Sequence, residues 1–325
     1  MYPDIPIWLA CIFTAGGLWL LKVSAEIFID GSAATAARLG ISPFVTGMVV
    51  VGFGTSAPEL CVSALSGIGG KSDLSLGNAY GSCICNIALI LGVAALIRPL
   101  RVSRTVRFFA VPALVAISVL SCCLVSLGNG FSRSDAFVCI GVFAVLLPLY
   151  CKFNSSSRAP APGEGKDPAA KTISAAKGVA MLLGGLVLLA GSSHILVWGA
   201  VDLALAMGVS ELLVGLTILA VGTSLPELAS AIVSARRGED DMVLGNIIGS
   251  NLFNTLAVVG VAGAISPFSK ISPYILSRDM PAMIALSVSI ALFALRKGRA
   301  GRLAGAIWLI SYAVYVAAMI MQETP

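Results

Sequence analysis

A six-residue motif occurs twice in this chain, each time inside a long apolar run. It reads GTSAPE at 54–59 and GTSLPE at 222–227, an offset of 168 residues. The motif predicts a helix end followed at once by a helix start: the glycine ends one half-helix, Thr or Ser caps the next, proline takes its first position and Glu lies in its first turn. A broken helix is tolerated at membrane depth only where it is buried in protein or lines a wet cavity. Two corresponding breaks therefore point to a transport site.

The composition agrees with a membrane protein of many spans. Of the 325 residues, 58% are hydrophobic and only 11% are charged, and a membrane-spanning helix needs about 20 mostly apolar residues. We predict an all-α membrane protein with ten transmembrane helices. They are placed near 6–30, 41–69, 73–97, 107–128, 134–153, 173–201, 209–236, 241–265, 280–296 and 302–321.

The ten spans form two related sets of five. Residues 45–92 and 213–260 align without gaps with 17 identities in 48 positions. A polar segment rich in Ser, Pro, Gly and charge separates a first five-helix repeat at 1–153 from a second at 173–325, and 154–172 is read as a cytoplasmic linker. Because each repeat has an odd number of spans, the second enters the membrane from the opposite side, so the repeats are inverted.

The distribution of basic residues predicts the orientation. With the N-terminus outside, sixteen Lys and Arg fall on the inner side, and the four on the outer side are Lys71, Arg133, Lys270 and Arg278. By the positive-inside rule, both termini are expected outside the cell (inner) membrane, which the chain crosses many times.

Glu59 and Glu227 are the central candidates for the site. A carboxylate in the middle of a membrane costs roughly 2.5–3.5 kcal/mol on insertion scales, and no Lys or Arg stands at a matching mid-span position to neutralise either one. The alternative is a protonated Glu that packs against a neighbouring span, but two copies in the same motif are hard to explain by packing. A bound cation is the natural partner.

A second repeated cluster follows in the next span of each half, GNAYGSCICN at 77–86 and GNIIGSNLFN at 245–254. Its Asn and Ser residues recur every four positions and share one helical face. They are either glue between helices or oxygen ligands, and the neighbouring breaks favour ligands. The predicted metal-binding set is Glu59, Glu227, Thr55, Thr223, Ser56, Ser224, Ser82, Ser250, Asn86 and Asn254, with backbone carbonyls freed around Gly52 and Ala220.

Ligation by oxygen alone suits hard cations. Ca²⁺ takes six to eight oxygens in flexible geometry, whereas Mg²⁺ sheds water reluctantly. Two carboxylates carry the charge that one Ca²⁺ cancels, or that several Na⁺ cancel instead. The residues therefore suggest exchange of Na⁺ for Ca²⁺ through one set of sites.

The pairs GTSAPE with GNAYGSCICN and GTSLPE with GNIIGSNLFN resemble the two alpha repeats of the cation/calcium exchanger superfamily, in the compact prokaryotic form of its sodium/calcium exchanger branch. The resemblance implies electrogenic antiport of several Na⁺ for one Ca²⁺ by alternating access, with Glu59 and Glu227 as ligands of both ions. Some relatives, including potassium-dependent ones, have Asp where this chain has Asn254, which puts potassium dependence in doubt.

The sequence also bears on activity, substrates and surroundings. We expect the chain to be a transporter and not an enzyme, and to need no cofactor. Its expected substrates are Ca²⁺ and Na⁺, and its surroundings are the lipid bilayer. No nucleic-acid partner is expected, and the chain is compatible with a monomer. Two alternatives stay open: a proton/Ca²⁺ exchanger, and a passive cation channel, which tight multidentate sites disfavour because they slow conduction.

Overall fold

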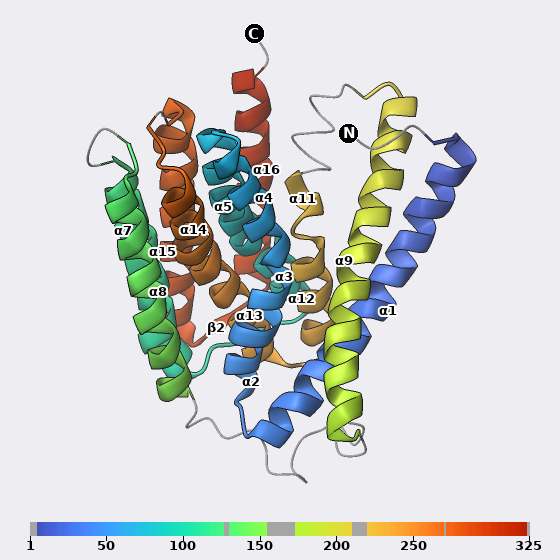
Figure 1. The fold of residues 1–325 in the computed structure, drawn as a ribbon. Helices are drawn as coiled ribbons and strands as arrows, with labels where there is room; N and C mark the ends of the chain where they lie inside the picture. Colours follow the sequence, from blue (N-terminus) through green and yellow to red (C-terminus); the bar gives the residue numbers. More distant parts are fainter. Residues whose placement is uncertain (1–4, 127–129, 155–172, 210–219, 270, 324–325) are drawn as a thin grey trace.

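A computed structural model describes residues 5–126, 130–154, 173–209, 220–269 and 271–323 of the chain, and these are almost entirely helical (Figure 1). Eight helices are long and apolar enough to cross a membrane, and the pair Pro43–Thr55 and Ala57–Ile68 adds a ninth span that bends by 45°. The remaining predicted span, 209–236, includes residues 210–219, which lie outside the described part. Within these bounds the structure has the all-helical membrane fold that the sequence predicts.

The helices and strands follow one another in two similar series. The first is α1 (Ile7–Leu39), α2 (Pro43–Val45), η1 (Thr46–Gly52), α3 (Phe53–Thr55), α4 (Ala57–Ile68), α5 (Ser72–Cys85), η2 (Asn86–Leu91), α6 (Gly92–Ile97), β1 (Leu100–Arg101), η3 (Val106–Ala110), α7 (Val111–Ser126) and α8 (Arg133–Asn154). The second is α9 (Ala175–Ala206), α11 (Ala220–Gly222), α12 (Leu225–Arg237), α13 (Asp240–Leu252), η6 (Phe253–Val258), α14 (Val259–Ile265), η7 (Ile275–Asp279), α15 (Met280–Lys297), β2 (Arg299–Ala300) and α16 (Arg302–Glu323). Segments labelled η are π-helical, with wider turns than an α-helix.

The two halves are related by a pseudo-two-fold axis. Equivalent residues of repeats related in this way meet where both lie close to the axis, and two pairs that are 168 residues apart do so. The Ser24 and Ser192 hydroxyls are 3.1 Å apart, and the Cys83 thiol lies 3.8 Å from the Asn251 carbonyl oxygen. The inverted repeat predicted from the sequence is thereby confirmed.

Short backbone pairings at the two ends of the molecule show the inversion directly. Leu100 of β1 pairs with Ala300 of β2 at one end, the lower one in Figure 1. Phe131 pairs with Phe268 two residues before the start of α8, and α8 starts at the opposite, upper end in Figure 1. At the 168-residue offset, Phe268 is the counterpart of Leu100 and Phe131 is the counterpart of Arg299, so the two pairings join corresponding segments of the repeats in registers that differ by one residue.

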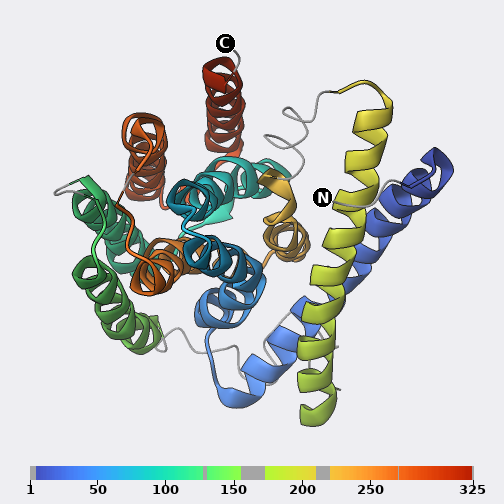
Figure 2. The ribbon, with the colours of Figure 1, turned by 45° about the horizontal axis from the view of Figure 1, so that its top comes forward.

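Helices α1 and α9 form a long tilted pair at one side of the molecule (Figures 1 and 2). Both exceed their predicted spans of 6–30 and 173–201, reaching Leu39 and Ala206. Glycines let the two backbones touch: a Cβ at Gly17 would lie 2.8 Å from the Leu196 backbone, and a Cβ at Gly185 would lie 2.7 Å from that of Phe28. Gly17 and Gly185 are repeat equivalents, so the crossing is symmetric.

The two spans that carry the Asn and Ser clusters lie at the centre. Of the most apolar stretch of each span, 89% is buried for Asp240–Ile265 and 72% for Ser72–Ile97, against 17% for the span of α16. Lipid can therefore reach the outer helices but hardly the central ones, and any polar side chain on the central pair must find its partners inside the protein.

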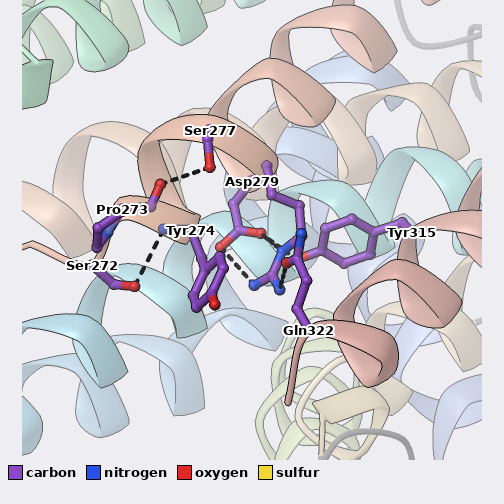
Figure 3. A network of polar contacts seen from close by, with 8 residues as sticks. Ser272, Pro273, Tyr274, Ser277, Asp279, Tyr315 and Gln322 are labelled. Carbon is purple, nitrogen blue, oxygen red and sulfur yellow. Dashed lines mark hydrogen bonds and ion pairs between the residues drawn. The ribbon is translucent and has the colours of Figure 1, made fainter. Parts of the chain in front are cut away.

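A polar network joins the start of α15 to the end of α16 (Figure 3). The Asp279 carboxylate accepts a hydrogen bond from Arg278 Nε at 2.6 Å and one from the Tyr315 hydroxyl at 3.0 Å, and Arg278 also donates to Gln322 Oε1 at 2.8 Å. The network thus ties the second-to-last span to the last at the end where α16 finishes.

Candidate functional site: two helix breaks that share buried carboxylates

Each repeated motif forms a helix break, but its residues act differently from the prediction. The first break falls at Ser56, between α3 and α4, so Gly54 lies inside the first half-helix and does not end it. Ser56 and Ser224 occupy the position before the next helix, yet neither caps it with its side chain, because their backbone (φ −87° and −92°, ψ 6°) is not the extended form that a capping serine needs. The prolines are the second residues of α4 and α12, not the first.

Both motif glycines serve close packing. A Cβ at Gly222 would lie 2.7 Å from a methyl group of Val197 on α9, and one at Gly54 would lie 3.3 Å from Leu186 on the same helix. Both glycines therefore allow the breaks to sit against the long α1–α9 pair. The prediction that glycine ends the half-helix is wrong for Gly54, because α3 continues to Thr55, and a helix can end without a left-handed residue when the chain continues directly into the next helix. In the second repeat, α11 does end at Gly222.

The carboxylates of Glu59 and Glu227 are both buried, with 0% and 1% exposure, and lie close enough to interact electrostatically. Each one faces the break of the other repeat. Ser56 Oγ donates a hydrogen bond to Glu227 Oε1 at 3.0 Å, and Thr55 lies beside the same carboxylate. Thr223 lies beside Glu59 in the matching way. The hydroxyls and carboxylates of the two halves thus belong to one site.

Asn78 and Asn246 hold the backbone of the two glutamates, a role that the sequence analysis did not assign. Asn78 Nδ2 donates to the Glu59 carbonyl oxygen at 3.1 Å, and Asn246 Nδ2 donates to that of Glu227 at 3.4 Å. Their spacing from the glutamates, 19 residues in each half, was the signal available in the sequence. These amides tie the first turns of α4 and α12 to the central spans α5 and α13.

The serines of the second cluster lie at the same centre. Ser82 lies beside the Glu59 carboxylate, and Ser250 Oγ donates to the Gly52 carbonyl oxygen at 3.3 Å. That carbonyl also accepts from the backbone N–H of Ser56 at 3.1 Å. Ala220 is the first described residue of α11, and the residues before it lie outside the described part of the chain.

Asn86 and Asn254 occupy equivalent places in the wide turns of η2 and η6, where each central span departs from α-helical geometry. Both are buried, at 1% and 0% exposure. π-Helical turns occur often at functional sites, because the extra residue in the turn re-aims side chains. Here they occur at the corresponding position of both repeats.

Many polar atoms at this centre have no hydrogen-bond partner among the described residues. The set consists of both Glu59 carboxylate oxygens, Glu227 Oε2, Asn86 Oδ1, Ser224 Oγ and both polar atoms of the Asn254 amide. The ion pairs found in the described part of the chain include neither glutamate. Buried acceptors without donors destabilise a protein unless something positive completes them.

The metal-binding chemistry available here is that of two carboxylates and several neutral oxygens. Within the described ranges no three His, Cys, Asp or Glu side chains gather in a group that could hold a metal ion. The acidic side chains at the centre are Glu59 and Glu227, and hydroxyl, amide and carbonyl oxygens surround them. Such a set fits Ca²⁺ or Na⁺ better than zinc or copper, which prefer nitrogen and sulfur ligands.

Inverted repeats, broken central helices and buried carboxylates at the centre of the fold define a membrane transporter of the alternating-access class. Comparison with known proteins gives the family. The model of the family described as "Sodium/calcium exchanger protein" matches residues 8–151 and 177–321. The chain belongs to this family.

Individual relatives cover almost the whole chain. CaxA from Alkalimonas amylolytica is 38% identical over 94% of this chain and 97% of its own length, and inner membrane protein YrbG from Escherichia coli (strain K12) is 36% identical over 93% and 94%. Among solved structures, the sodium-calcium exchanger NCX_Mj soaked with 10 mM Na⁺ and zero Ca²⁺ is similar at a TM-score of 0.82 and 30% identity, covering 96% of this chain and 99% of that one. The likeness therefore extends over both repeats.

Proposed function

We propose that this chain exchanges Na⁺ for Ca²⁺ across the inner membrane by alternating access, with Glu59 and Glu227 as the shared ligands of both ions. The proposal rests on the buried oxygens around these two carboxylates that have no hydrogen-bond partner among the described residues. None of the ion pairs in the described part of the chain brings a Lys or Arg to either carboxylate. Membership of the sodium/calcium exchanger family supports Na⁺ and Ca²⁺ as the substrates.

Charge balance supports alternate binding of the two ions. One Ca²⁺ neutralises two ionised carboxylates, and Na⁺ ions bound in its place also cancel their charge. Binding of both kinds at once would leave excess positive charge in a medium where it is poorly screened. The neutral ligands are proposed to be Thr55, Thr223, Ser56, Ser224, Ser82, Ser250, Asn86 and Asn254, with the carbonyls of Gly52 and Ala220. Because each carboxylate faces hydroxyls of the other repeat, a bound ion would join the two halves.

The charge of the site also bears on potassium. Asn254 and Asn86 are neutral and stand 27 residues after their glutamates, so both halves offer the same Glu-plus-Asn set. A K⁺ beside Ca²⁺ would exceed the two negative charges of the site, and desolvation of an uncompensated charge is costly. We therefore infer that exchange does not need K⁺.

The test is Ca²⁺ uptake into proteoliposomes loaded with Na⁺ and diluted into Na⁺-free buffer, with K⁺ replaced by choline on both sides. We expect uptake that depends on the Na⁺ gradient and is unchanged without K⁺. The same vesicles under a proton gradient alone should take up little Ca²⁺. Uptake driven by protons would favour the proton/Ca²⁺ exchanger, and uptake that returns only when K⁺ is added would contradict the charge argument.

A further inference from the structure

Asn251 lies beside the proposed site and takes no part in the ligand set described above. It belongs to α13 and is 1% exposed. It faces Cys83 of α5, its equivalent in the other repeat, close to the pseudo-two-fold axis. A buried amide at this place either holds helices together or fixes the orientation of a neighbouring side chain. The hydrogen bonds of Asn251 distinguish between these two roles.

Three groups form a directed chain of hydrogen bonds. The backbone carbonyl of Cys83 can only accept, so the nearby end of the Asn251 amide must be its NH₂ group, and Nδ2 lies 3.4 Å from that carbonyl oxygen. The other end of Asn251 is then its oxygen, which accepts from Asn86 Nδ2 at 3.0 Å. The fixed acceptor thereby determines the orientation of both amides in turn.

The orientation of Asn251 decides where the side-chain oxygen of Asn86 points. Since its NH₂ group is held by Asn251, its Oδ1 atom points elsewhere, and this oxygen is buried without a hydrogen-bond partner in the described part of the structure. A cation can use an amide only through its oxygen. Asn251 thus leaves Asn86 with the end that a cation needs.

No equivalent chain of hydrogen bonds leads to Asn254 among the described residues. The position equivalent to Asn251 holds Cys83, whose thiol contacts the backbone carbonyl oxygen of Asn251 at 3.8 Å and the Thr255 hydroxyl at 3.5 Å. Among the described residues neither polar atom of the Asn254 amide has a hydrogen-bond partner. Among the described residues, the two amides of the pseudo-symmetric pair therefore differ: a neighbour orients Asn86, and none orients Asn254.

We propose that Asn251 is a positioning residue for cation exchange, which fixes the amide of Asn86 with its oxygen toward the bound ion. The inference rests on the proposed function, because it assumes that Asn86 is a ligand. Without Asn251, the Asn86 amide would turn freely, and its NH₂ group would be attracted to the unpaired carboxylate oxygens of the site. Only the fraction of molecules with the oxygen inward would then bind well.

The experiment is a double-mutant cycle read by equilibrium ⁴⁵Ca²⁺ binding to the purified full chain and by Ca²⁺ uptake. Asn251→Ala should weaken Ca²⁺ binding about twofold for a freely turning amide, and up to about tenfold if the NH₂ group prefers the site, because apparent affinity scales with the competent fraction. The KM for Ca²⁺ should rise more than the maximal rate falls.

The second arm of the cycle uses Asn86→Asp, whose carboxyl group has an oxygen at both ends. A cation therefore meets an oxygen in either orientation, and a bound proton can lie on the oxygen that is turned away from the ion. In this background Asn251→Ala should not weaken binding further. Cys83→Ala is the matched control: it alters the equivalent side chain of the other repeat but keeps the backbone carbonyl that anchors Asn251, so binding should stay at the wild-type level.

Equal weakening by Asn251→Ala in the wild-type chain and in the Asn86→Asp variant would show a packing role and overturn the proposal, as would no weakening in either. If Asn251→Ala does not fold, Asn251→Cys replaces it, since the first repeat already carries that residue at this place. A wild-type chain that binds no Ca²⁺ would refute the proposed function itself, and this outcome is distinct from every result of the cycle.

Discussion

At the scale of single residues, the site depends on contacts that cross between repeats. Glu227 accepts a hydrogen bond from Ser56, and Thr223 lies beside Glu59, so neither half holds its own carboxylate alone. The hydroxyl groups that could have capped their own helices face the other repeat. A change at one break should therefore affect ion binding by the whole site.

Replacement of either glutamate should abolish exchange. Glu59→Gln or Glu227→Gln removes one of only two negative charges and one ligand oxygen, and an amide supplies neither, so Ca²⁺ uptake should fall to the level of protein-free vesicles. Glu26→Gln is the control, because Glu26 is 42% exposed and pairs with Lys22 on the surface of α1. Uptake close to that of the wild type in either site variant would refute the assignment.

An added carboxylate at Asn254 should make transport sensitive to pH. Asn254→Asp places a third acid near two others in a buried site, where like charges and desolvation favour its protonated form. A proton would then compete with the transported cation, so uptake should fall more steeply between about pH 8 and about pH 6 than in the wild type. Initial rates at both pH values test this, and an identical ratio for the two proteins would contradict it.

At the scale of elements, one set of residues packs the helix breaks against α9, and a separate set joins the outer spans to each other. Glycines set the breaks against α9, whereas the Asp279 network joins α15 to α16 on another part of the molecule. The side chain of Asp279 is 5% exposed and that of Arg278 is 15% exposed. An ion pair buried to this degree is costly to break by removal of one partner.

Asp279→Ala should therefore lower stability without loss of ion binding. It leaves Arg278 without its carboxylate, and the midpoint of thermal unfolding in detergent should fall clearly, while the affinity for Ca²⁺ stays the same. Ser277→Ala is the control on the same segment, since its exposed hydroxyl bonds the carbonyl of Pro273 (Figure 3). A fall in affinity with unchanged stability would show that the network serves the site instead.

At the scale of the whole molecule, the described ends of the chain gather at one side. Helix α1 begins and α16 finishes at the upper end in Figure 1, while α8 finishes and α9 begins at the lower end. Arg98 and Arg237, which are among the sixteen basic residues on the predicted inner side, form ion pairs with Asp240 and Asp30, respectively. The positions of these helix ends agree with the topology predicted from the basic residues. Which end faces the inside of the cell remains a prediction.

Cysteine labelling in intact cells tests that orientation. Residue 156 lies in the predicted cytoplasmic linker, outside the described part of the chain, so Ser156→Cys should resist a membrane-impermeant thiol reagent. Lys71→Cys, in an exposed loop assigned to the outer side, should react. The background must first lose the exposed native thiols, namely Cys11, Cys61 and Cys123. The opposite labelling pattern would invert the topology.

The sequence by itself determined the parts of this protein that depend on local pattern and repetition. Apolar runs of membrane length predicted the helical fold, and an odd number of spans per repeat predicted the inversion, because each span must cross the bilayer. The motif also located both breaks and both glutamates. These features survive without tertiary information, since the bilayer imposes them on any chain that crosses it.

Only the tertiary structure decided which groups meet. The pairing of Ser56 with Glu227, the packing role of Gly54 and the chain from Cys83 through Asn251 to Asn86 all join residues of different helices, and no spacing along one helix encodes them. The wide turns at Asn86 and Asn254 likewise have no signature in the residue pattern. The physical reason is that side-chain partners are chosen by the way helices pack, whereas helix position in a membrane is chosen by hydrophobicity along the chain.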